Sequence, residues 1–286
     1  MSLDNTWFTE IYAKENSAFS LKITEKLFEE QSPFQRVEVY QTVSFGRLMT
    51  IDGIIMLTDR DNFLYHEMMS HPALFTHPAP KRVLIIGGGD CGTLREVLKH
   101  PGVEEVTQVD IDETVTRAAI QFFPKLVESN DDPRARLRFA DGIKWVKEAA
   151  AGYYDIIIVD STDPVGPAVG LFNEAFVRDC HRALSADGLL VQQSESPLYN
   201  LRDILLPMYR NMYNAGFQDV HSLHFPQTVY PSGWWTATVA RKAGKVADFR
   251  ERDAATKPFE TEYYNVDIHR GALATPEFMK RALAGL

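Results

Sequence analysis

Short stretches of alternating apolar and polar residues occupy the start of the chain. Gln35–Tyr40 reads QRVEVY, the alternation typical of a half-buried antiparallel strand. Ser20–Glu25 and Arg47–Ile51 are similar short runs, and Phe45–Arg47 and Ile51–Gly53 carry the glycines of turns. The pattern predicts a small N-terminal all-β unit.

A helix and a proline-containing linker follow this unit. The mostly apolar run from Asp61 to Phe75 predicts the helix, and His77–Pro80 (HPAP) predicts the linker. We therefore expect residues 1–75 to form a small β domain with a connecting helix, and residues 76–286 to form a larger domain.

Beyond the linker, strands and helices alternate. Arg82–Ile86 is an apolar strand that runs into Gly87–Gly89 and then a helix. The other predicted strands are Val106–Asp110, Leu137–Asp141, Tyr154–Asp160 and Gly188–Gln193, and the predicted helices are Thr93–His100, Glu113–Phe123 and Asn173–Leu184. This alternation predicts an α/β fold with a parallel, doubly wound sheet.

Composition narrows the class of protein. The chain has 286 residues, 45% of them hydrophobic, but no apolar run approaches the ~18 residues of a membrane span. We expect no secretory signal at the N-terminus and, with only Cys91 and Cys180, no disulfide framework, so a cytoplasmic location is predicted. A net charge of −9 argues against a nucleic-acid partner, which would need clustered Lys and Arg.

Acidic residues follow the predicted strands one after another. Asp90 follows the first strand of the larger domain, and Asp110, Asp141 and Asp160 close the next three, with Asp163 just beyond. Any one of them could be a turn residue or a helix cap. Because ligands of open α/β sheets bind beyond the carboxyl ends of the strands, the whole set predicts a binding rim.

The glycine loop points to a cationic nucleoside. Gly87, Gly89 and Gly92 fit G-x-G-x-x-G, with an acid about 20 residues further on, as in dinucleotide enzymes. Asp90, however, lies inside the loop, where its carboxylate would repel a pyrophosphate and attract a cation. Asp110 is placed to accept from ribose hydroxyls and Asp141–Gly142 to reach adenine, so the pattern favours the S-adenosyl class of ligand.

Five longer motifs run in order along the chain. They are Tyr65–Met68 (YHEM), Gly87–His100 (GGGDCGTLREVLKH), Asp160–Pro167 (DSTDPVGP), Tyr230–Gly233 (YPSG) and Tyr263–His269 (YYNVDIH). Together they resemble the motifs of spermidine synthases, the polyamine aminopropyltransferases. The likeness extends from about Trp7 to Leu283.

The resemblance implies a fold, substrates and an assembly. It implies a small N-terminal β domain followed by a Rossmann-like catalytic domain of the class I methyltransferase type, in a homodimer or homotetramer. The implied donor is decarboxylated S-adenosylmethionine as a co-substrate and the implied acceptor is putrescine, giving spermidine and methylthioadenosine. The family implies no metal and no tightly bound cofactor.

The resemblance also assigns residues to roles. Asp160 would be the catalytic base, with Tyr65 beside it, and Asp90 would hold the aminopropyl ammonium. The implied nucleoside contacts are Gln35, Gly87, Gly89, Asp110, Asp141 and Gly142. The implied lining of the amine and donor pocket is His66, Asp163, Gln193 and Tyr230, with Trp7 closing it.

The reaction explains why these residue types are needed. An amine nitrogen attacks the carbon next to a sulfonium, and the leaving group is a neutral thioether that needs no general acid. A free alkylamine has a pKa of ~10.4 and is protonated at neutral pH. A base such as Asp160 must therefore accept its proton at or before attack. Crowded carboxylates would themselves raise the pKa of the amine, so we expect alignment of nitrogen, carbon and sulfur to supply much of the rate.

Two positions depart from the family pattern. Asp110 stands where many members have Glu, and Cys91 where many have Gly. Cys91 could carry an acidic, reactive thiol if it lay near a helix N-terminus, although a merely tolerated small residue is favoured. His66 and His71 are wrongly spaced on a helix to share a metal.

Other functions stay open on sequence alone. An amine N-methyltransferase would use intact S-adenosylmethionine, which Asp90 disfavours. Cadaverine, agmatine or spermidine could replace putrescine as acceptor. An NAD-dependent oxidoreductase and a nucleotide-binding protein without turnover are further alternatives. The segment 164–171 could act as a lid over the substrates.

Overall fold

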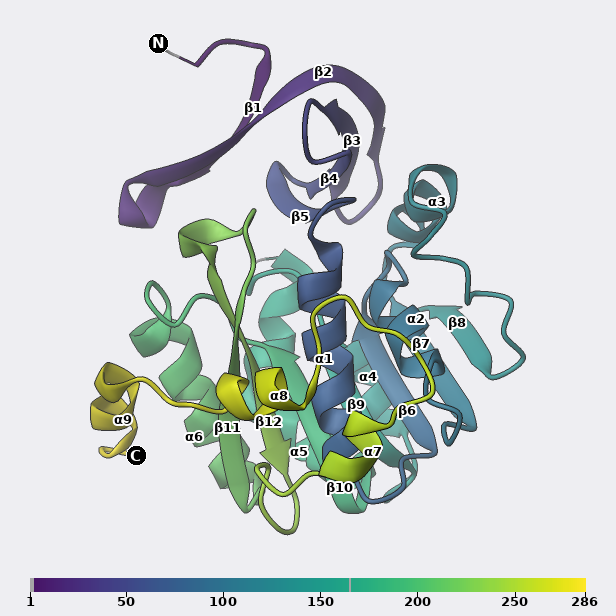
Figure 1. The fold of residues 1–286 in the computed structure, drawn as a ribbon, viewed down its shortest axis with the longest axis vertical. Helices are drawn as coiled ribbons and strands as arrows, with labels where there is room; N and C mark the ends of the chain where they lie inside the picture. The colour runs from purple at the N-terminus through teal and green to yellow at the C-terminus, as the bar shows by residue number, and fades with distance from the viewer. Residues whose placement is uncertain (1–2, 165) are drawn as a thin grey trace.

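The alternating N-terminal segment forms a five-stranded antiparallel sheet in the computed structural model, which describes residues 3–164 and 166–286. Its strands pair in chain order and are β1 (Trp7–Tyr12), β2 (Ser17–Gln31), β3 (Arg36–Thr42), β4 (Arg47–Ile51) and β5 (Ile54–Thr58). The short 3-10 helix η1 (Ala13–Glu15) joins β1 to β2. This small sheet lies at one end of the molecule, above the larger domain in the view of Figure 1.

The larger domain is built on a seven-stranded sheet of order β11-β12-β10-β9-β6-β7-β8. Its strands are β6 (Arg82–Gly87), β7 (Glu105–Asp110), β8 (Ala135–Phe139), β9 (Tyr154–Asp160), β10 (Leu184–Gln193), β11 (Asp219–Pro226) and β12 (Trp234–Arg241). Strands β6 to β10 pair in parallel, as predicted. Strands β11 and β12 extend the predicted sheet, and β12 runs antiparallel to both of its neighbours. Residues 227–233, which connect them, are too few for the crossover that parallel strands require.

Helices cover both faces of this sheet. They are α1 (Asn62–Thr76), α2 (Gly92–Leu98), α3 (Glu113–Phe122), α4 (Gly142–Glu148), α5 (Glu174–Ala183), α6 (Leu206–Ala215), α7 (Glu251–Ala255), α8 (Val266–Ala272) and α9 (Glu277–Leu283), with short helical turns η2 (Gly166–Phe172), η3 (Leu201–Leu205) and η4 (Pro231–Gly233). Alternate residues of β6 belong to different cores: Val83 and Ile85 pack with α1 and α2, whereas Leu84 and Ile86 pack with α5 and α6. This is the two-sided burial of a doubly wound sheet.

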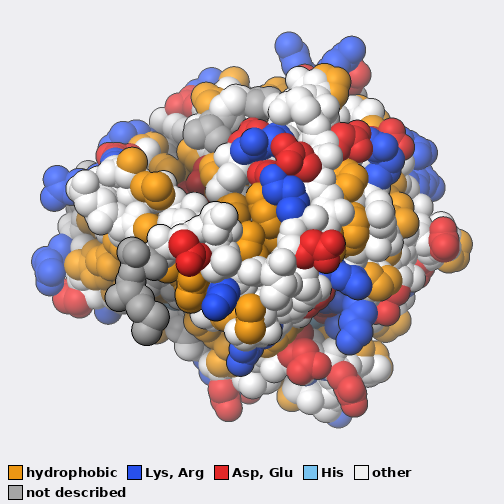
Figure 2. Space-filling model, turned by 90° about the horizontal axis from the view of Figure 1, so that it is seen from above, with side chains coloured by type: hydrophobic (Ala, Val, Ile, Leu, Met, Phe, Trp, Pro, Cys, Tyr) orange, Lys and Arg blue, Asp and Glu red, His pale blue; other side chains and the backbone are white. Residues whose placement is uncertain are grey.

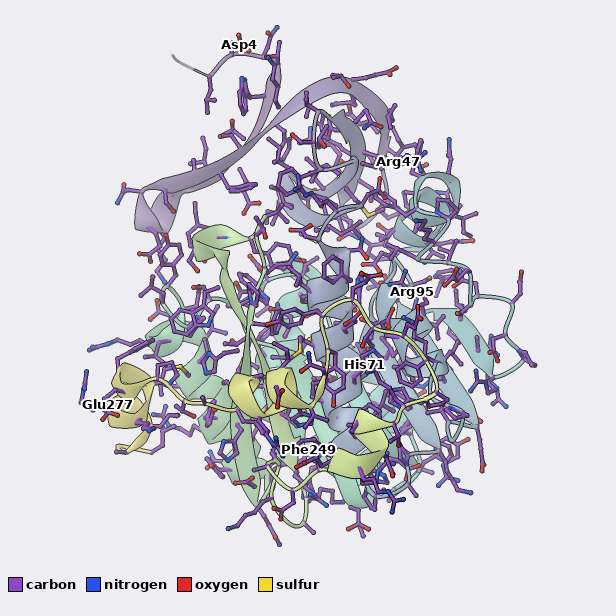
Figure 3. All side chains as sticks on the ribbon, viewed as in Figure 1. Asp4, Arg47, His71, Arg95, Phe249 and Glu277 are labelled. Carbon is purple, nitrogen blue, oxygen red and sulfur yellow. The ribbon has the colours of Figure 1, made fainter. Side chains whose placement is uncertain are left out.

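Helix α1 runs through the middle of the molecule and is buried from Tyr65 to Thr76. The C-terminal segment crosses it, and Glu67 accepts hydrogen bonds from the backbone N–H groups of Glu262, Tyr263 and Tyr264 at 2.7–2.9 Å. His71, further along the same helix, lies beneath this segment in the view with all side chains drawn (Figure 3). The helix is therefore packed between the sheet and the C-terminal segment.

The small sheet shares a core with the larger domain. Val39 and Met49 of the small sheet are fully buried and pack with Ala119 of α3 and Phe123 after it. Seen from the end that carries the small sheet, acidic, basic and hydrophobic side chains are interspersed over the surface (Figure 2). Helix α1 ends one residue beyond the predicted division at residue 75.

Candidate active site

A cavity of about 160 Å³ lies where the carboxyl ends of β6, β7 and β9 meet the small sheet. The small sheet contributes apolar walls from Met49, Ile51 and Leu57. The cavity is also lined by most of the residues assigned from the sequence: Gln35, Tyr65, His66, Gly87, Gly89, Asp90, Asp110, Asp141, Gly142, Asp160 and Tyr230. The structure thus brings together acids that lie up to 70 positions apart in the chain.

The glycines of the loop after β6 allow a close approach to β9. Gly87 has φ +82°, and a Cβ atom there would collide with the backbone oxygen of Asp160. Gly88 donates its N–H to that same oxygen at 2.7 Å. A side chain at Gly92 would collide with the His66 ring. Here the glycines pack the loop tightly against its neighbours, which is a different role from cradling a pyrophosphate.

Asp160 is held by hydroxyl groups on both carboxylate oxygens. The Tyr65 hydroxyl donates to Oδ1 at 2.7 Å, and the Thr93 hydroxyl donates to Oδ2 at 2.6 Å. Burial and then the charge of Asp90 raise the pKa of Asp160, while His66, Thr93 and Tyr65 oppose the rise. Burial, followed by the charge of Asp160, raises the pKa of Tyr65 well above its usual value, so Tyr65 acts as a neutral donor.

Asp90 is paired with His66 across the loop. The His66 Nε2 atom lies 3.2 Å from Asp90 Oδ1, which also accepts the N–H of Gly92 at 2.6 Å. Burial alone would raise the pKa of Asp90, but the neighbouring His66 outweighs it and lowers that pKa. Burial alone would lower the pKa of His66, but the Asp90 carboxylate raises it overall. The Asp90 carboxylate thus favours the protonated form of His66, beside the group assigned to the donor.

The two carboxylates assigned to the nucleoside, Asp110 and Asp141, differ in exposure. Burial raises the pKa of Asp110 to about 6, against a hydrogen bond from the N–H of Asp112. Asp141 is exposed and caps α4, with Oδ1 accepting the N–H groups of Ile143 and Lys144. Oδ1 of Asp141 thus caps α4, and the side chain still borders the cavity.

A second, smaller cavity of about 30 Å³ adjoins the first and shares Tyr65, Ser161, Thr162 and Tyr230 with it. Asp163 and Gln193, both assigned from the sequence, line it, and so does Trp235. Glu10, to which no role was assigned from the sequence, also lines it.

Two acids near this cavity were missed from the sequence. Burial raises the pKa of Glu10 to about 7, although its carboxylate accepts the N–H of Ile55 at 2.8 Å. Glu195 is 1% exposed, and burial followed by the neighbouring Asp163 raises its pKa well above the usual value. Glu195 follows the end of β10, so the rule that found the other strand-end acids could have found it. No comparable signal marks Glu10.

Three further sequence assignments have different outcomes. Trp7 begins β1 and is absent from the described lining of both cavities, so its closing role stays a prediction. The suggested lid 164–171 includes Val165, which lies outside the described residues, while Ala168 and Leu171 border the main cavity. Cys91 caps the start of α2 but is fully buried, and burial raises the pKa of its thiol to about 12, so the unreactive interpretation holds.

Across residues 3–164 and 166–286, no group of three or more His, Cys, Asp or Glu side chains is arranged to hold a metal ion. Over the same ranges, every helix is too short or too polar to cross a membrane.

The comparisons with known proteins agree with this geometry. Residues 62–251 match the spermine/spermidine synthase domain, and residues 6–59 match the spermidine synthase tetramerisation domain. The chain belongs to the spermidine synthase family. A polyamine aminopropyltransferase of Thioalkalivibrio sulfidiphilus is 64% identical over 285 residues, covering 100% of both chains, and one of Methylococcus capsulatus is 64% identical over 98% of each.

Solved structures of the family have the same fold. A spermidine synthase in complex with the transition state analogue AdoDATO superposes with a TM-score of 0.94 at 36% identity, over 100% of this chain and 97% of that one. The spermidine synthase from Thermotoga maritima gives a TM-score of 0.93, also at 36% identity and with the same coverage. The chain is thus a transferase of the polyamine aminopropyltransferase family, with the predicted Rossmann-like domain and small N-terminal β domain.

Proposed function

We propose that this protein transfers the aminopropyl group of decarboxylated S-adenosylmethionine to putrescine, giving spermidine and methylthioadenosine. The observation that carries the proposal is Asp160, held at both oxygens between the donor-side pair of Asp90 and His66 and a second cavity lined by acids. The relatives' names and the AdoDATO complex of a spermidine synthase support the same reaction.

The charge around Asp90 favours the decarboxylated donor. In that donor the group beyond the sulfonium ends in an ammonium, which the Asp90 carboxylate attracts. Intact S-adenosylmethionine would bring its own carboxylate to the same place, where like charges in a partly buried site repel strongly. Asp110, with Gln35, Asp141 and Gly142, supplies polar groups for the ribose and adenine.

The acids of the second cavity favour a diamine as acceptor. One nitrogen of putrescine would lie near Asp160 and Tyr65, and the other would lie toward Asp163 and Glu10. Tyr230 borders both cavities, and its hydroxyl is tied to the Met56 carbonyl, so it forms a fixed apolar wall between the two ends. A monoamine would leave the second set of acids without a cation.

The proposed reaction is a single displacement. The neutral amine nitrogen forms a bond to the carbon next to the sulfonium, the carbon–sulfur bond breaks, and its electron pair stays on sulfur as a neutral thioether. The proton lost from the amine goes to Asp160. Tyr65 holds Oδ1 without adding charge, so Asp160 keeps a fixed orientation toward the nucleophile.

We also propose that the protein works as a homo-oligomer, a dimer or tetramer. The match of residues 6–59 to a tetramerisation domain supports this, and β1 is an edge strand of the small sheet. Light scattering coupled to gel filtration would give the mass of the assembly, and a monomer at working concentration would contradict it.

Product analysis tests the reaction. Purified protein is incubated with putrescine and either decarboxylated or intact S-adenosylmethionine, and the products are identified by mass spectrometry. We expect spermidine and methylthioadenosine from the decarboxylated donor alone. Asp160→Asn keeps the size of the side chain but removes the base, so turnover should fall by about 10²-fold or more. Methylated putrescine from the intact donor would overturn the proposal, and circular dichroism checks that the variant is folded.

A further inference from the structure

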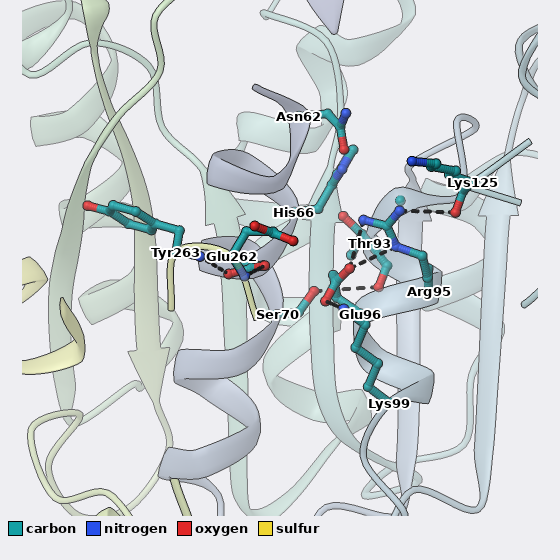
Figure 4. A network of polar contacts seen from close by, with 12 residues as sticks. Asn62, His66, Ser70, Thr93, Arg95, Glu96, Lys99, Lys125, Glu262 and Tyr263 are labelled. Carbon is teal, nitrogen blue, oxygen red and sulfur yellow. Dashed lines mark hydrogen bonds and ion pairs between the residues drawn. The ribbon is translucent and has the colours of Figure 1, made fainter. Parts of the chain in front are cut away.

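Thr93 carries a hydroxyl whose only hydrogen bond to a described residue is to Asp160. It is the second residue of α2 and is fully buried, and its Oγ1 atom lies 2.6 Å from Asp160 Oδ2. Figure 4 shows it on the side of α2 that faces α1, close to His66. Thr93 is absent from the described lining of both cavities, so it contacts Asp160 from behind and leaves the substrate space free.

The two hydroxyls on Asp160 come from different helices. Tyr65 of α1 donates to Oδ1, and Thr93 of α2 donates to Oδ2. The glycine loop closes round the second oxygen, because a Cβ atom on Gly88 would lie 3.0 Å from Oδ2. Tyr65 also borders both cavities and is therefore available to substrate. The Thr93 hydroxyl, in contrast, donates to Asp160 and borders neither cavity.

The surroundings of Asp160 make this hydroxyl important. The titratable groups that face it are Tyr65 and His66 of α1, Asp90 of the glycine loop, Asp110 at the end of β7, and Tyr230. Burial and the two other carboxylates favour the protonated form of Asp160, which cannot accept a proton from the amine. A hydrogen bond from a neutral donor favours the ionised form and adds no positive charge that would repel the ammonium groups of the substrates.

We propose that Thr93 is a positioning residue, which keeps Asp160 ionised and oriented through the hydrogen bond to Oδ2. The inference rests on the proposed function, in which Asp160 is the base. Thr93 does not touch either substrate, so it acts by increasing the fraction of enzyme molecules in which Asp160 is ionised and can accept a proton.

The pH dependence of kcat/KM separates this role from a structural one. Thr93→Val keeps the shape of the side chain and removes the hydroxyl, while Thr93→Ser keeps the hydroxyl. We expect the acidic limb of the profile to move up by about one pH unit in T93V, because the carboxylate loses a hydrogen bond that favours its charged form. On that limb T93V should be about tenfold slower than the wild type, approaching it at alkaline pH, and T93S should follow the wild type.

The outcomes distinguish the failure of this inference from that of the proposed function. An acidic limb at the same pH in T93V and the wild type, or an equal loss at every pH, would overturn the role of Thr93. If Asp160→Asn retained turnover, the base itself would be wrongly assigned, whatever T93V did. Thr93→Ala, which also lacks the hydroxyl, is measured alongside, so the test does not depend on the folding of one variant.

Discussion

Burial and neighbouring groups shift the pKa values of several carboxylates around the cavities in different directions. Asp90 lies beside His66 and stays ionised, whereas burial and a nearby carboxyl keep Glu195 protonated well beyond its usual range. Burial and Asp90 raise the pKa of Asp160, while hydrogen bonds from two hydroxyls oppose that rise. Charge in this site is therefore set residue by residue, although all the groups are carboxylic acids.

The pairing of His66 with Asp90 predicts that donor binding releases a proton. Asp90 raises the pKa of His66, and a donor ammonium beside Asp90 would oppose that rise, so donor affinity should increase with pH as His66 loses its proton. We expect calorimetric titration with decarboxylated S-adenosylmethionine to show proton release, and His66→Gln to abolish it.

Methylthioadenosine is the matched control ligand, because it lacks the aminopropyl ammonium. Its affinity should change little over the same pH range. An equal pH dependence for both ligands would show that the titrating group belongs to the nucleoside end, such as Asp110, whose pKa is raised to about 6.

The raised pKa of Glu10 leads us to expect that acceptor binding also strengthens as pH rises, for a different reason than donor binding. Its pKa of about 7 means that it is neutral below that pH and becomes a carboxylate above it. The KM for putrescine should therefore fall as pH rises from 6 to 8, and Glu10→Gln should flatten the change and raise KM at pH 8 by about tenfold. Glu25→Gln, an exposed glutamate of β2, is the control. An unchanged KM in E10Q would exclude Glu10 from the acceptor site.

At the scale of elements, α1 both lines the main cavity and anchors the C-terminal segment. Its first turns carry Tyr65 and His66 into the cavity, and the next residue, Glu67, is 1% exposed and anchors the C-terminal segment by three backbone hydrogen bonds. One helix thus positions the hydroxyl that donates to Asp160 and holds the C-terminal segment in place.

Glu67→Gln should loosen that segment. The amide offers one acceptor and turns an NH₂ group toward backbone donors, so we expect the free energy of unfolding to fall by about 2–4 kcal/mol. Urea denaturation measures the loss, and limited proteolysis should give earlier cleavage within residues 257–265. Glu260→Gln, whose side chain is exposed, is the matched control. Equal midpoints for E67Q and the wild type would mean that the segment is held by its aromatic contacts instead.

The elements differ in how far the sequence predicts them. The buried parallel strands were predictable because apolar runs such as Tyr154–Asp160 end in an acid, and the carboxyl ends of such strands meet at one edge. Strand β11 was missed because Asp219, His221 and His224 interrupt its apolar pattern, and its place depends on pairing with β12. Thr93 was missed because a threonine inside a glycine-rich motif carries no charge to mark it.

At the scale of the whole molecule, the two sheets pack as one body. Val39 and Met49 of the small sheet share a core with α3, and the Ser32 hydroxyl donates to Asp112 at 2.7 Å across the same junction. The cavities lie at this junction, so their shape depends on contacts that neither sheet makes alone. Glu10 could not be predicted because its carboxylate meets the N–H of Ile55, 45 residues away, only in the folded small sheet.

The position of Glu10 on the first strand separates the origins of the acids around the two cavities. The acids of the main cavity follow strands of the large sheet, whereas Glu10 of the second cavity belongs to the N-terminal hairpin. No residue of this hairpin is in the described lining of the main cavity. If the second cavity takes the acceptor as proposed, a chimera with the first thirty residues of a relative should change amine preference and leave donor affinity unchanged.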